Sequence, residues 1–239
     1  MPVLVITGTG TEVGKTVATA AVAAAALAAG RSVAVLKAAQ TGVRQDERGD
    51  AEEVARLAGA VTARELARYP DPLAPGTAAR RAGRAPVHPQ DVAEAAAKLA
   101  TEHDLVLVEG AGGLLVRLDP AGGTLADAAE LLSAPVLLVA SAGLGTLNTT
   151  ELTARELRAR RLDLLGVVIG SWPSDPDLAS RCNVTDLPQV AAAPLLGALP
   201  ANAAALPPAA FRRTAPNWLA PRLDGTWDAE AFQVRAAPR

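Results

Sequence analysis

A glycine-rich segment near the start of the chain has the residue types that bind phosphate. It reads GTGTEVGKT from Gly8 to Thr16 and lies between an apolar strand, Val3–Thr7, and a helix. Backbone N–H groups of such a loop, and the positive end of the helix behind it, converge on phosphate oxygens. Lys15 would neutralise the β- and γ-phosphates, and the Thr16 hydroxyl would ligate Mg²⁺. This context predicts a nucleoside triphosphate site and argues against a chance glycine-rich turn.

Charged residues at the ends of other apolar runs add further chemistry. Glu109 closes a very apolar strand and opens the run EGAGG, and Lys37 closes another strand in LKAAQTG. In open α/β sheets the carboxyl ends of the strands face the ligand crevice, so both side chains point to the phosphate loop. Asp50 begins a helix and is a third candidate. Each has a structural alternative: a buried strand-end glutamate, a lysine that snorkels to solvent, and an N-cap aspartate.

The alternation of short apolar runs with helical patterns predicts the sheet that must position these residues. Nearly continuous apolar runs suit parallel strands that are buried on both faces. We therefore predict an α/β fold, a three-layer doubly wound and mostly parallel sheet of the P-loop NTPase kind. The predicted strands are Val3–Thr7, Val33–Lys37, Leu105–Glu109, Val136–Ala140, Leu165–Gly170 and Leu195–Leu199. The predicted helices are Gly14–Ala29, Ala51–Ala58, Pro89–Glu102, Leu125–Leu132 and Asn148–Arg160.

The remaining segments predict the domain organisation. Tyr69–Pro89 is rich in proline, glycine and arginine, and we expect a long irregular connection that acts as a lid or substrate loop. Nothing marks a domain boundary, so residues 1–225 are predicted to form a single P-loop α/β domain. The weakly patterned residues 226–239 are expected to form a loosely ordered tail.

Composition narrows the range of partners. The net charge is −2, which argues against nucleic acid or an anionic membrane as the main partner. The apolar run Val17–Ala29 is too short to span a bilayer, and no targeting signal is visible. The single cysteine, Cys182, cannot form a disulfide framework, and a reducing compartment fits it. We expect a cytoplasmic enzyme.

Five segments in the right order resemble the dethiobiotin synthetase family, over residues 1–200. They are GTGTEVGKT at 8–16, LKAAQTG at 36–42, GDAEEVARLAG at 49–59, LVLVEGAGGLLV at 105–116 and GLGTLNTTELT at 143–153. The family also shares the phosphate loop that is one residue longer than the general pattern. The EGAGG and GTLN segments make the resemblance far more specific than the phosphate loop does.

The resemblance implies a reaction in which 7,8-diaminononanoate, CO₂ and ATP give dethiobiotin, ADP and phosphate. It implies that Lys15 and Lys37 are catalytic and stabilise the phosphoryl transition state and a carbamate intermediate. It also implies that Mg²⁺ is held by Thr16, Asp50 and Glu109. The protein's part in such a transfer is mainly positioning and charge stabilisation.

The resemblance also assigns binding residues. The nucleotide and metal would be held by Thr11, Glu12, Val13, Gly14, Lys15, Thr16, Val17, Asp50, Glu109, Gly110, Ala111, Gly112, Gly170, Ser171, Pro200, Ala201 and Asn202. Thr41 would touch the diamine or carbamate. The substrate's distant carboxylate would bind at a helix start formed by Gly145, Thr146, Leu147 and Asn148. In the family that helix belongs to the other subunit, so a homodimer is implied.

Two positions depart from the family pattern. Ala38 follows the strand lysine where proline is frequent, which would loosen the turn without removing chemistry. Gly170-Ser171-Trp172-Pro173 lacks an asparagine that reads the adenine edge in many relatives. Base recognition would then depend on backbone groups and on Pro200–Asn202. ATP is the expected co-substrate, and another triphosphate such as CTP stays an alternative.

Other classes of P-loop protein fit less well. Partition and site-selection ATPases of the ParA and MinD kind carry an early lysine in the loop where this chain has Gly10. Amide-forming synthetases of the cobyrinate type need a glutaminase domain, whereas this chain offers one cysteine and two histidines. A pure binding module does not need paired lysines and carboxylates around a phosphate loop. The switch ATPase is the alternative that we retain.

Overall fold

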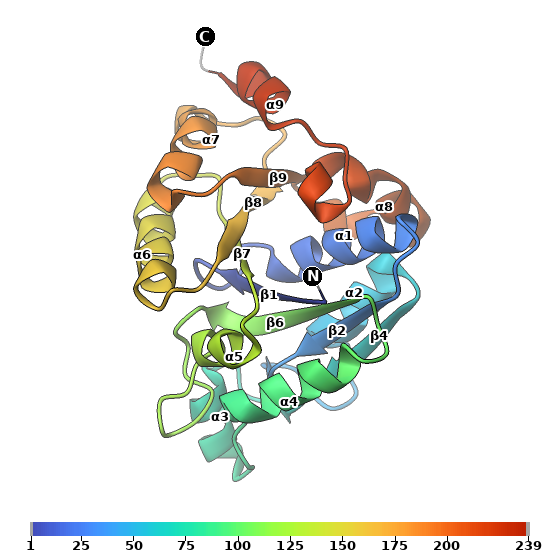
Figure 1. Ribbon diagram of the computed structural model, residues 1–239, viewed down its shortest axis with the longest axis vertical. Coiled ribbons are helices and arrows are strands. Elements are labelled where there is room, and N and C mark those ends of the chain that lie inside the picture. The colour runs from blue at the N-terminus through green and yellow to red at the C-terminus, as the bar shows by residue number, and fades with distance from the viewer. Residues whose placement is uncertain (1, 238–239) are drawn as a thin grey trace.

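The computed structural model describes residues 2–237. Within them a parallel sheet of seven strands runs in the order β4-β2-β6-β1-β7-β8-β9. The strands are β1 Val3–Gly8, β2 Val33–Lys37, β4 Val61–Glu65, β6 Leu105–Gly113, β7 Val136–Ala140, β8 Leu164–Trp172 and β9 Leu195–Pro200. The predicted α/β architecture is confirmed, and β1, which leads into the phosphate loop, is central in the sheet (Figure 1).

Helices cover both faces of the sheet. On one face lie α1 Lys15–Ala28, α2 Asp50–Ala58 and α8 Pro208–Thr214, and on the other α4 Pro89–Leu99 and α5 Leu125–Leu132 (Figure 1). A third apolar cluster surrounds β8 and β9 and is formed by α6 Thr146–Ala159, α7 Leu178–Ala191 and α9 Ala229–Ala236. Seven alanines of α1 are buried: Ala18, Ala20, Ala21, Ala23, Ala24, Ala25 and Ala26. Their small side chains let α1 pack closely on the sheet.

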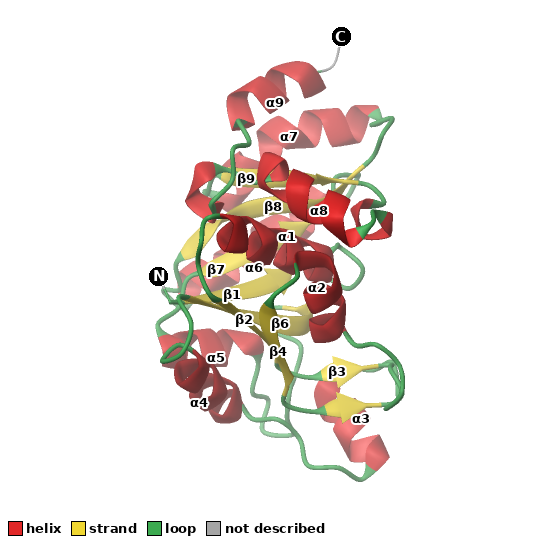
Figure 2. Cartoon of the chain, turned by 90° about the vertical axis from the view of Figure 1, so that its right-hand side faces the viewer, coloured by secondary structure: helices red, strands yellow, loops and turns green. Residues whose placement is uncertain are grey.

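Several elements were not predicted. Strand β4 is an edge strand with the sequence VTARE, whose half-exposed residues give no apolar run. Two short strands, β3 Gln40–Thr41 and β5 Arg68–Tyr69, form a separate parallel pair beside α3 Pro75–Ala82 (Figure 2). Helix α3 lies in the segment 69–89, so that connection is partly helical and not wholly irregular. Helix α7 contains the stretch around Cys182 whose polar residues masked a helical pattern.

The end of the chain also differs from expectation. Residues 226–237 are packed on the body of the protein and include helix α9. Trp227 is buried, and its backbone N–H donates to the Leu219 carbonyl at 2.8 Å. Phe232 of α9 makes an edge contact with Trp172 at the end of β8, with ring centroids 5.1 Å apart. The expectation of a loose tail is therefore wrong for this segment, and residues 238–239 lie outside the described part.

Candidate nucleotide and metal site

The predicted residues meet at the carboxyl ends of β1, β2 and β6. A cavity of about 920 Å³ opens there between the phosphate loop, the start of α2 and the segment before α3. Many of its walls are residues that the sequence singled out. These are Thr11, Glu12, Gly14, Lys15, Thr16, Val17, Lys37, Thr41, Asp50, Ala111 and Gly112.

The phosphate loop leaves the start of α1 open to an anion. Gly14 has φ 92° and precedes the helix, and no side chain of the described residues caps the helix N-terminus. Its N–H groups are therefore available to a ligand. Lys15 folds back along the loop, and its Nζ donates to the Gly10 carbonyl at 2.7 Å. The loop is preformed for phosphate oxygens.

A close backbone contact fixes where the loop lies. A Cβ at Gly14 would lie 2.5 Å from the Gly170 carbonyl oxygen, and a Cβ at Gly170 would lie 2.0 Å from the Val13 carbonyl oxygen. Only glycine fits at both positions. The end of β8 therefore supports the phosphate loop directly, which is a role for Gly170 that its sequence context did not reveal.

Four polar side chains gather behind the phosphate loop. The Lys37 Nζ lies 2.8 Å from Glu109 Oε1 and 2.5 Å from Asp50 Oδ2, and it also donates to the Gly110 carbonyl at 3.0 Å. The Thr16 hydroxyl donates to Glu109 Oε1 at 3.0 Å. Lys37 therefore joins the two predicted carboxylates, and Thr16 reaches one of them. Glu109 itself is 99% buried, as the alternative of a buried strand-end glutamate describes, and it does not line the cavity directly.

Thr19 completes this group and was missed by sequence reasoning. Its hydroxyl donates to Glu109 Oε2 at 2.6 Å, and the hydroxyl oxygen also lies 2.9 Å from the Lys15 carbonyl oxygen. Thr19 follows Thr16 by almost one helical turn on α1, so both hydroxyls lie on the face toward β6. A second hydroxyl, three residues after Thr16 in an alanine-rich helix, was the available signal.

The site balances its own charges. Burial acts to lower the pKa of Lys37, but the Glu109 and Asp50 carboxylates outweigh it and raise this pKa above its usual value. The pKa of Lys15 is lowered, first by burial and then by the positive charge of Lys37. Lys37 is thus firmly charged, whereas Lys15 gains from any anion that binds beside it.

Asp50 reaches the site because of how α2 begins. The N-cap residue is Gly49, so the alternative in which Asp50 itself caps the helix is wrong. The Asp50 N–H donates to Gln40 Oε1 at 2.8 Å, and the Gly49 N–H donates to Glu52 Oε2 at 2.9 Å. These contacts leave the Asp50 carboxylate free to meet Lys37. Gln40 is a second residue that sequence reasoning missed.

The donor set fits a hard divalent cation. Thr16, Asp50 and Glu109 supply oxygen atoms, the type that Mg²⁺ prefers. The space between Asp50 and Glu109 also favours positive charge, because the Lys37 ammonium lies between these two carboxylates. Among the described residues no group of three or more acidic, histidine or cysteine side chains forms a complete cage. Phosphate oxygens and water would therefore supply the remaining ligands of Mg²⁺.

The far wall of the cavity is apolar. Thr41 lies on this side, and the segment between β5 and α3 contributes most of the rest. This wall is formed by Ala39, Val43, Pro72, Leu73, Ala74, Pro75 and Val116. The cavity is therefore polar at the phosphate loop and apolar at its other end, and the run PLAP within 69–89 was the signal for it.

Other predicted residues lie outside this cavity. Val13 and Gly110 are buried beneath its walls. Ser171 lies near the end of β8, beyond the Gly14–Gly170 contact, and Pro200 ends β9 and is followed by Ala201 and Asn202. There the Ala201 N–H donates to the Trp172 carbonyl at 2.7 Å. Gly145, Thr146, Leu147 and Asn148 form the start of α6, where Gly145 and Asn148 are exposed and Thr146 is buried, and they do not line the cavity.

A second cavity, of about 630 Å³, shares no lining residue with the first. Its acidic groups already have partners in the protein. Asp119 contacts His88 Nδ1 at 2.8 Å, and Arg160 contacts both Asp127 and Glu130. Because its charges are satisfied internally, it is not a second candidate for the phosphate site.

Comparisons with known proteins agree with this geometry. The profile of a family described as AAA domain matches residues 3–209. A ParA family ATPase from Chlorobium tepidum is similar in structure, with a TM-score of 0.56 and 14% identity over 98% of each chain. At that identity the likeness shows the fold alone. None of the described helices has the length and apolar character needed to cross a membrane.

Sequence relatives are much more specific. The chain is 78% identical to an ATP-dependent dethiobiotin synthetase from Streptomyces coelicolor, over 100% of both chains. It is 70% identical to another from Saccharopolyspora erythraea, over 95% of this chain and 99% of the relative. These identities extend over nearly the whole of both chains, and the chain therefore belongs to the ATP-dependent dethiobiotin synthetase family.

Proposed function

We propose that the protein is a carbon–nitrogen cyclo-ligase that converts 7,8-diaminononanoate and CO₂ to dethiobiotin, with ATP giving ADP and phosphate. The observation that carries this proposal is the continuous cavity of about 920 Å³, which joins the phosphate loop to Lys37 and then to an apolar wall. A phosphate site, a buried cation and an apolar pocket are what a triphosphate, a carbamate and an aliphatic diamine require together.

The chemistry proceeds in three steps. One amine adds to CO₂ and loses a proton, which gives a carbamate. A carbamate oxygen then attacks the γ-phosphorus, the bond to the β–γ bridging oxygen breaks, and ADP leaves. Finally the second amine attacks the carbonyl carbon of the mixed anhydride, phosphate departs with the C–O electron pair, and loss of a proton completes the cyclic urea.

The residues of the site have distinct tasks in these steps. The α1 N-terminus and Lys15 hold the phosphates, and phosphate binding would keep Lys15 charged despite its burial. Lys37, fixed by Glu109, carries positive charge next to the carbamate and the transferring phosphoryl group. Mg²⁺, held by Thr16, Asp50 and Glu109, would offset charge on the phosphate oxygens. The apolar wall near Thr41 would pack on the hydrocarbon chain of the diamine.

We also propose that the working form is a homodimer. Helix α6 begins after Gly145, which has φ 92°, and no described side chain caps it, so its start resembles that of α1. Its N–H groups suit the substrate carboxylate. Leu144 beside it is 93% exposed and Leu152 on the same helix is 61% exposed. Such leucines next to a binding turn support an interface between two copies.

Two finer points belong to the same proposal. Base recognition at Gly170–Pro173 and Pro200–Asn202 would depend on backbone groups, so CTP is a candidate beside ATP. A cytoplasmic location is proposed because the reaction uses ATP and the chain has one cysteine.

The proposal is tested by phosphate release from the purified protein with Mg·ATP and bicarbonate, with and without 7,8-diaminononanoate. We expect release that depends on the diamine, with dethiobiotin as the product. Replacing ATP by CTP then tests the base site. Nucleotide binding without diamine-dependent release would overturn the ligase and favour a switch ATPase.

A further inference from the structure

Arg68 lies at the centre of a polar network beside the site, at the start of β5. Its Nε and Nη2 donate to the two Glu65 carboxylate oxygens at 2.8 and 2.9 Å. The planar guanidinium matches the carboxylate as a fork, and hydrogen bonds from Glu65 raise the pKa of Arg68 above its usual value. The Arg68 side chain is only 12% exposed. An arginine held so firmly on one side can act as a fixed anchor on the other.

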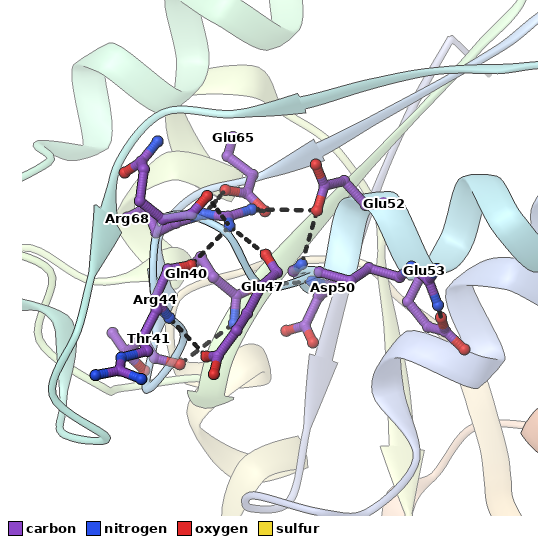
Figure 3. A network of polar contacts seen from close by, with 12 residues as sticks. Gln40, Thr41, Arg44, Glu47, Asp50, Glu52, Glu53, Glu65 and Arg68 are labelled. Atoms are coloured by element: carbon purple, nitrogen blue, oxygen red, sulfur yellow. Dashed lines mark hydrogen bonds and ion pairs between the residues drawn. The ribbon is translucent and has the colours of Figure 1, made fainter.

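The free side of this guanidinium holds the segment 42–49, which leads from β3 into α2. Its Nη1 donates to the Glu47 carbonyl at 2.6 Å and to the Arg44 carbonyl at 3.1 Å (Figure 3). The Arg44 N–H in turn donates to Glu47 Oε2 at 2.8 Å. The Arg68 side chain therefore holds two carbonyl groups of this segment, and the Arg44–Glu47 contact adds one bond within the segment.

The same residues also fix the first turn of α2. A Cβ at Gly49 would lie 2.1 Å from Glu65 Oε1 and 2.8 Å from Arg68 Nη2, so the backbone there rests on the ion pair. Glu52 accepts from the Gly49 N–H at 2.9 Å and lies 3.4 Å from Arg68 Nη2. Gln40, which pairs with Arg68 across β3 and β5, accepts from the Asp50 N–H. The contacts of Gly49, Glu52 and Gln40 thus link this network to the backbone at Asp50.

We propose that Arg68 is a positioning residue for Asp50. By holding segment 42–49 and the first turn of α2, it fixes the position of the Asp50 carboxylate, which completes the cation site. Asp50 is the more exposed of the two site carboxylates, with a side chain 36% exposed, whereas that of Glu109 is 1% exposed. Glu109 is fixed by its strand and by two threonines. Asp50 depends on its backbone and on Lys37, so an outside anchor matters more for it.

The inference rests on the proposed function only in that Asp50 serves Mg²⁺ bound with a nucleotide. It is tested with Arg68→Ala, which removes the guanidinium, and with Arg68→Lys. The lysine keeps the charge, but its single ammonium cannot contact Glu65 and the carbonyls of segment 42–49 together. Arg81→Lys is the matched control, since Arg81 contacts Asp71 on the exposed surface away from this network. ADP is the probe for all variants.

In the protein without ligand, amide hydrogen exchange should become faster across 42–52 in Arg68→Ala, where the N–H groups of Arg44, Gly49 and Asp50 are now bonded. The Mg²⁺ concentration for half-maximal ADP binding should rise about tenfold, as for other residues that orient metal ligands. ADP affinity measured without Mg²⁺ should not change. A merely structural role would lower ADP affinity with and without the metal alike.

A double-mutant cycle separates action through Asp50 from any other route. Arg68→Ala should add nothing to the Mg²⁺ requirement when Asp50→Asn is already present. Additive effects, or an unchanged Mg²⁺ requirement in a folded Arg68 variant, would overturn the proposal. If Arg68→Ala does not fold, Arg68→Lys gives the same comparisons. Failure of diamine-dependent turnover in the unaltered protein would reject the proposed function alone, because these measurements follow ADP binding.

Discussion

Lys37 is the residue on which the charge balance of the site depends. It neutralises Glu109, which is buried, and Asp50, which faces the cavity. We expect Lys37→Ala to cut turnover by orders of magnitude and to leave nucleotide binding nearly intact. The ligand-free variant should also lose about 3–5 kcal/mol of stability, because Glu109 is left without its cation.

Thermal unfolding with and without Mg·ADP measures this effect. Mg·ADP should restore part of the lost stability, because a bound cation replaces the missing charge. Lys98→Ala on the exposed side of α4 is the control and should behave as the unaltered protein. An unchanged turnover number in Lys37→Ala would remove Lys37 from the mechanism.

Thr19 offers a more delicate test of the same carboxylate. Thr19→Val keeps the shape of the side chain but removes the hydroxyl that donates to Glu109 Oε2. We expect a loss of about 1–3 kcal/mol from the unpaired buried oxygen, together with a higher Mg²⁺ requirement for turnover. Thr19→Ser keeps the hydroxyl and should recover most of both. Equal behaviour of the two variants would mean that the hydroxyl is not what orients Glu109.

The sequence revealed residues of the site unequally. Lys15 and Thr16 belong to a local motif, and Lys37 and Glu109 end apolar strands, so their convergence follows from parallel topology. Thr19, Gln40 and Arg68 act through contacts between segments far apart in the chain. No local pattern distinguishes such a residue from an ordinary helix threonine or surface arginine.

At the scale of elements, a close backbone contact joins the phosphate loop to the end of β8. Gly170→Ala would place a methyl group on the Val13 carbonyl oxygen and against Val139. We expect a destabilisation of about 1–3 kcal/mol, typical of overpacking, and weaker ADP binding because the loop is displaced. Calorimetric titration with ADP checks the second effect. Gly143→Ala has open space around it and should change neither property.

Elements were predicted well where burial alone determines the pattern. Strands β1, β2, β6, β7, β8 and β9 are apolar runs between helices, and all of them were located from sequence. Edge strand β4 is half exposed, and β3 and β5 are each two residues long, so none of them carries such a run. Helix α9 was not predicted because its apolar residues, such as Phe232, and the preceding Trp227 pack on distant β8 and α7 and show little periodicity of their own.

At the scale of the whole molecule, the proposed dimer has a direct test. Light scattering should show two copies, and the double variant Leu144→Glu, Leu152→Glu should show one, because buried charges oppose association. The KM of this double variant for the diamine should rise while its ADP affinity stays the same. The reason is that a monomer lacks the start of α6 from the second copy, which would bind the substrate carboxylate. Val234→Glu on α9, at a side chain that is 77% exposed, is the control. A monomeric unaltered protein would contradict the proposal.

The aromatic contacts near the end of the chain have a spectroscopic consequence. All three tryptophans, Trp172, Trp218 and Trp227, lie at the β8–β9 end, and each has a phenylalanine ring within 5.3 Å between centroids. Indole emission therefore reports on that end, whereas far-ultraviolet circular dichroism averages over every helix. If the two signals melt together, the chain unfolds as one cooperative unit. If they separate, the strands that carry Lys37 and Glu109 open independently of the end that α9 covers.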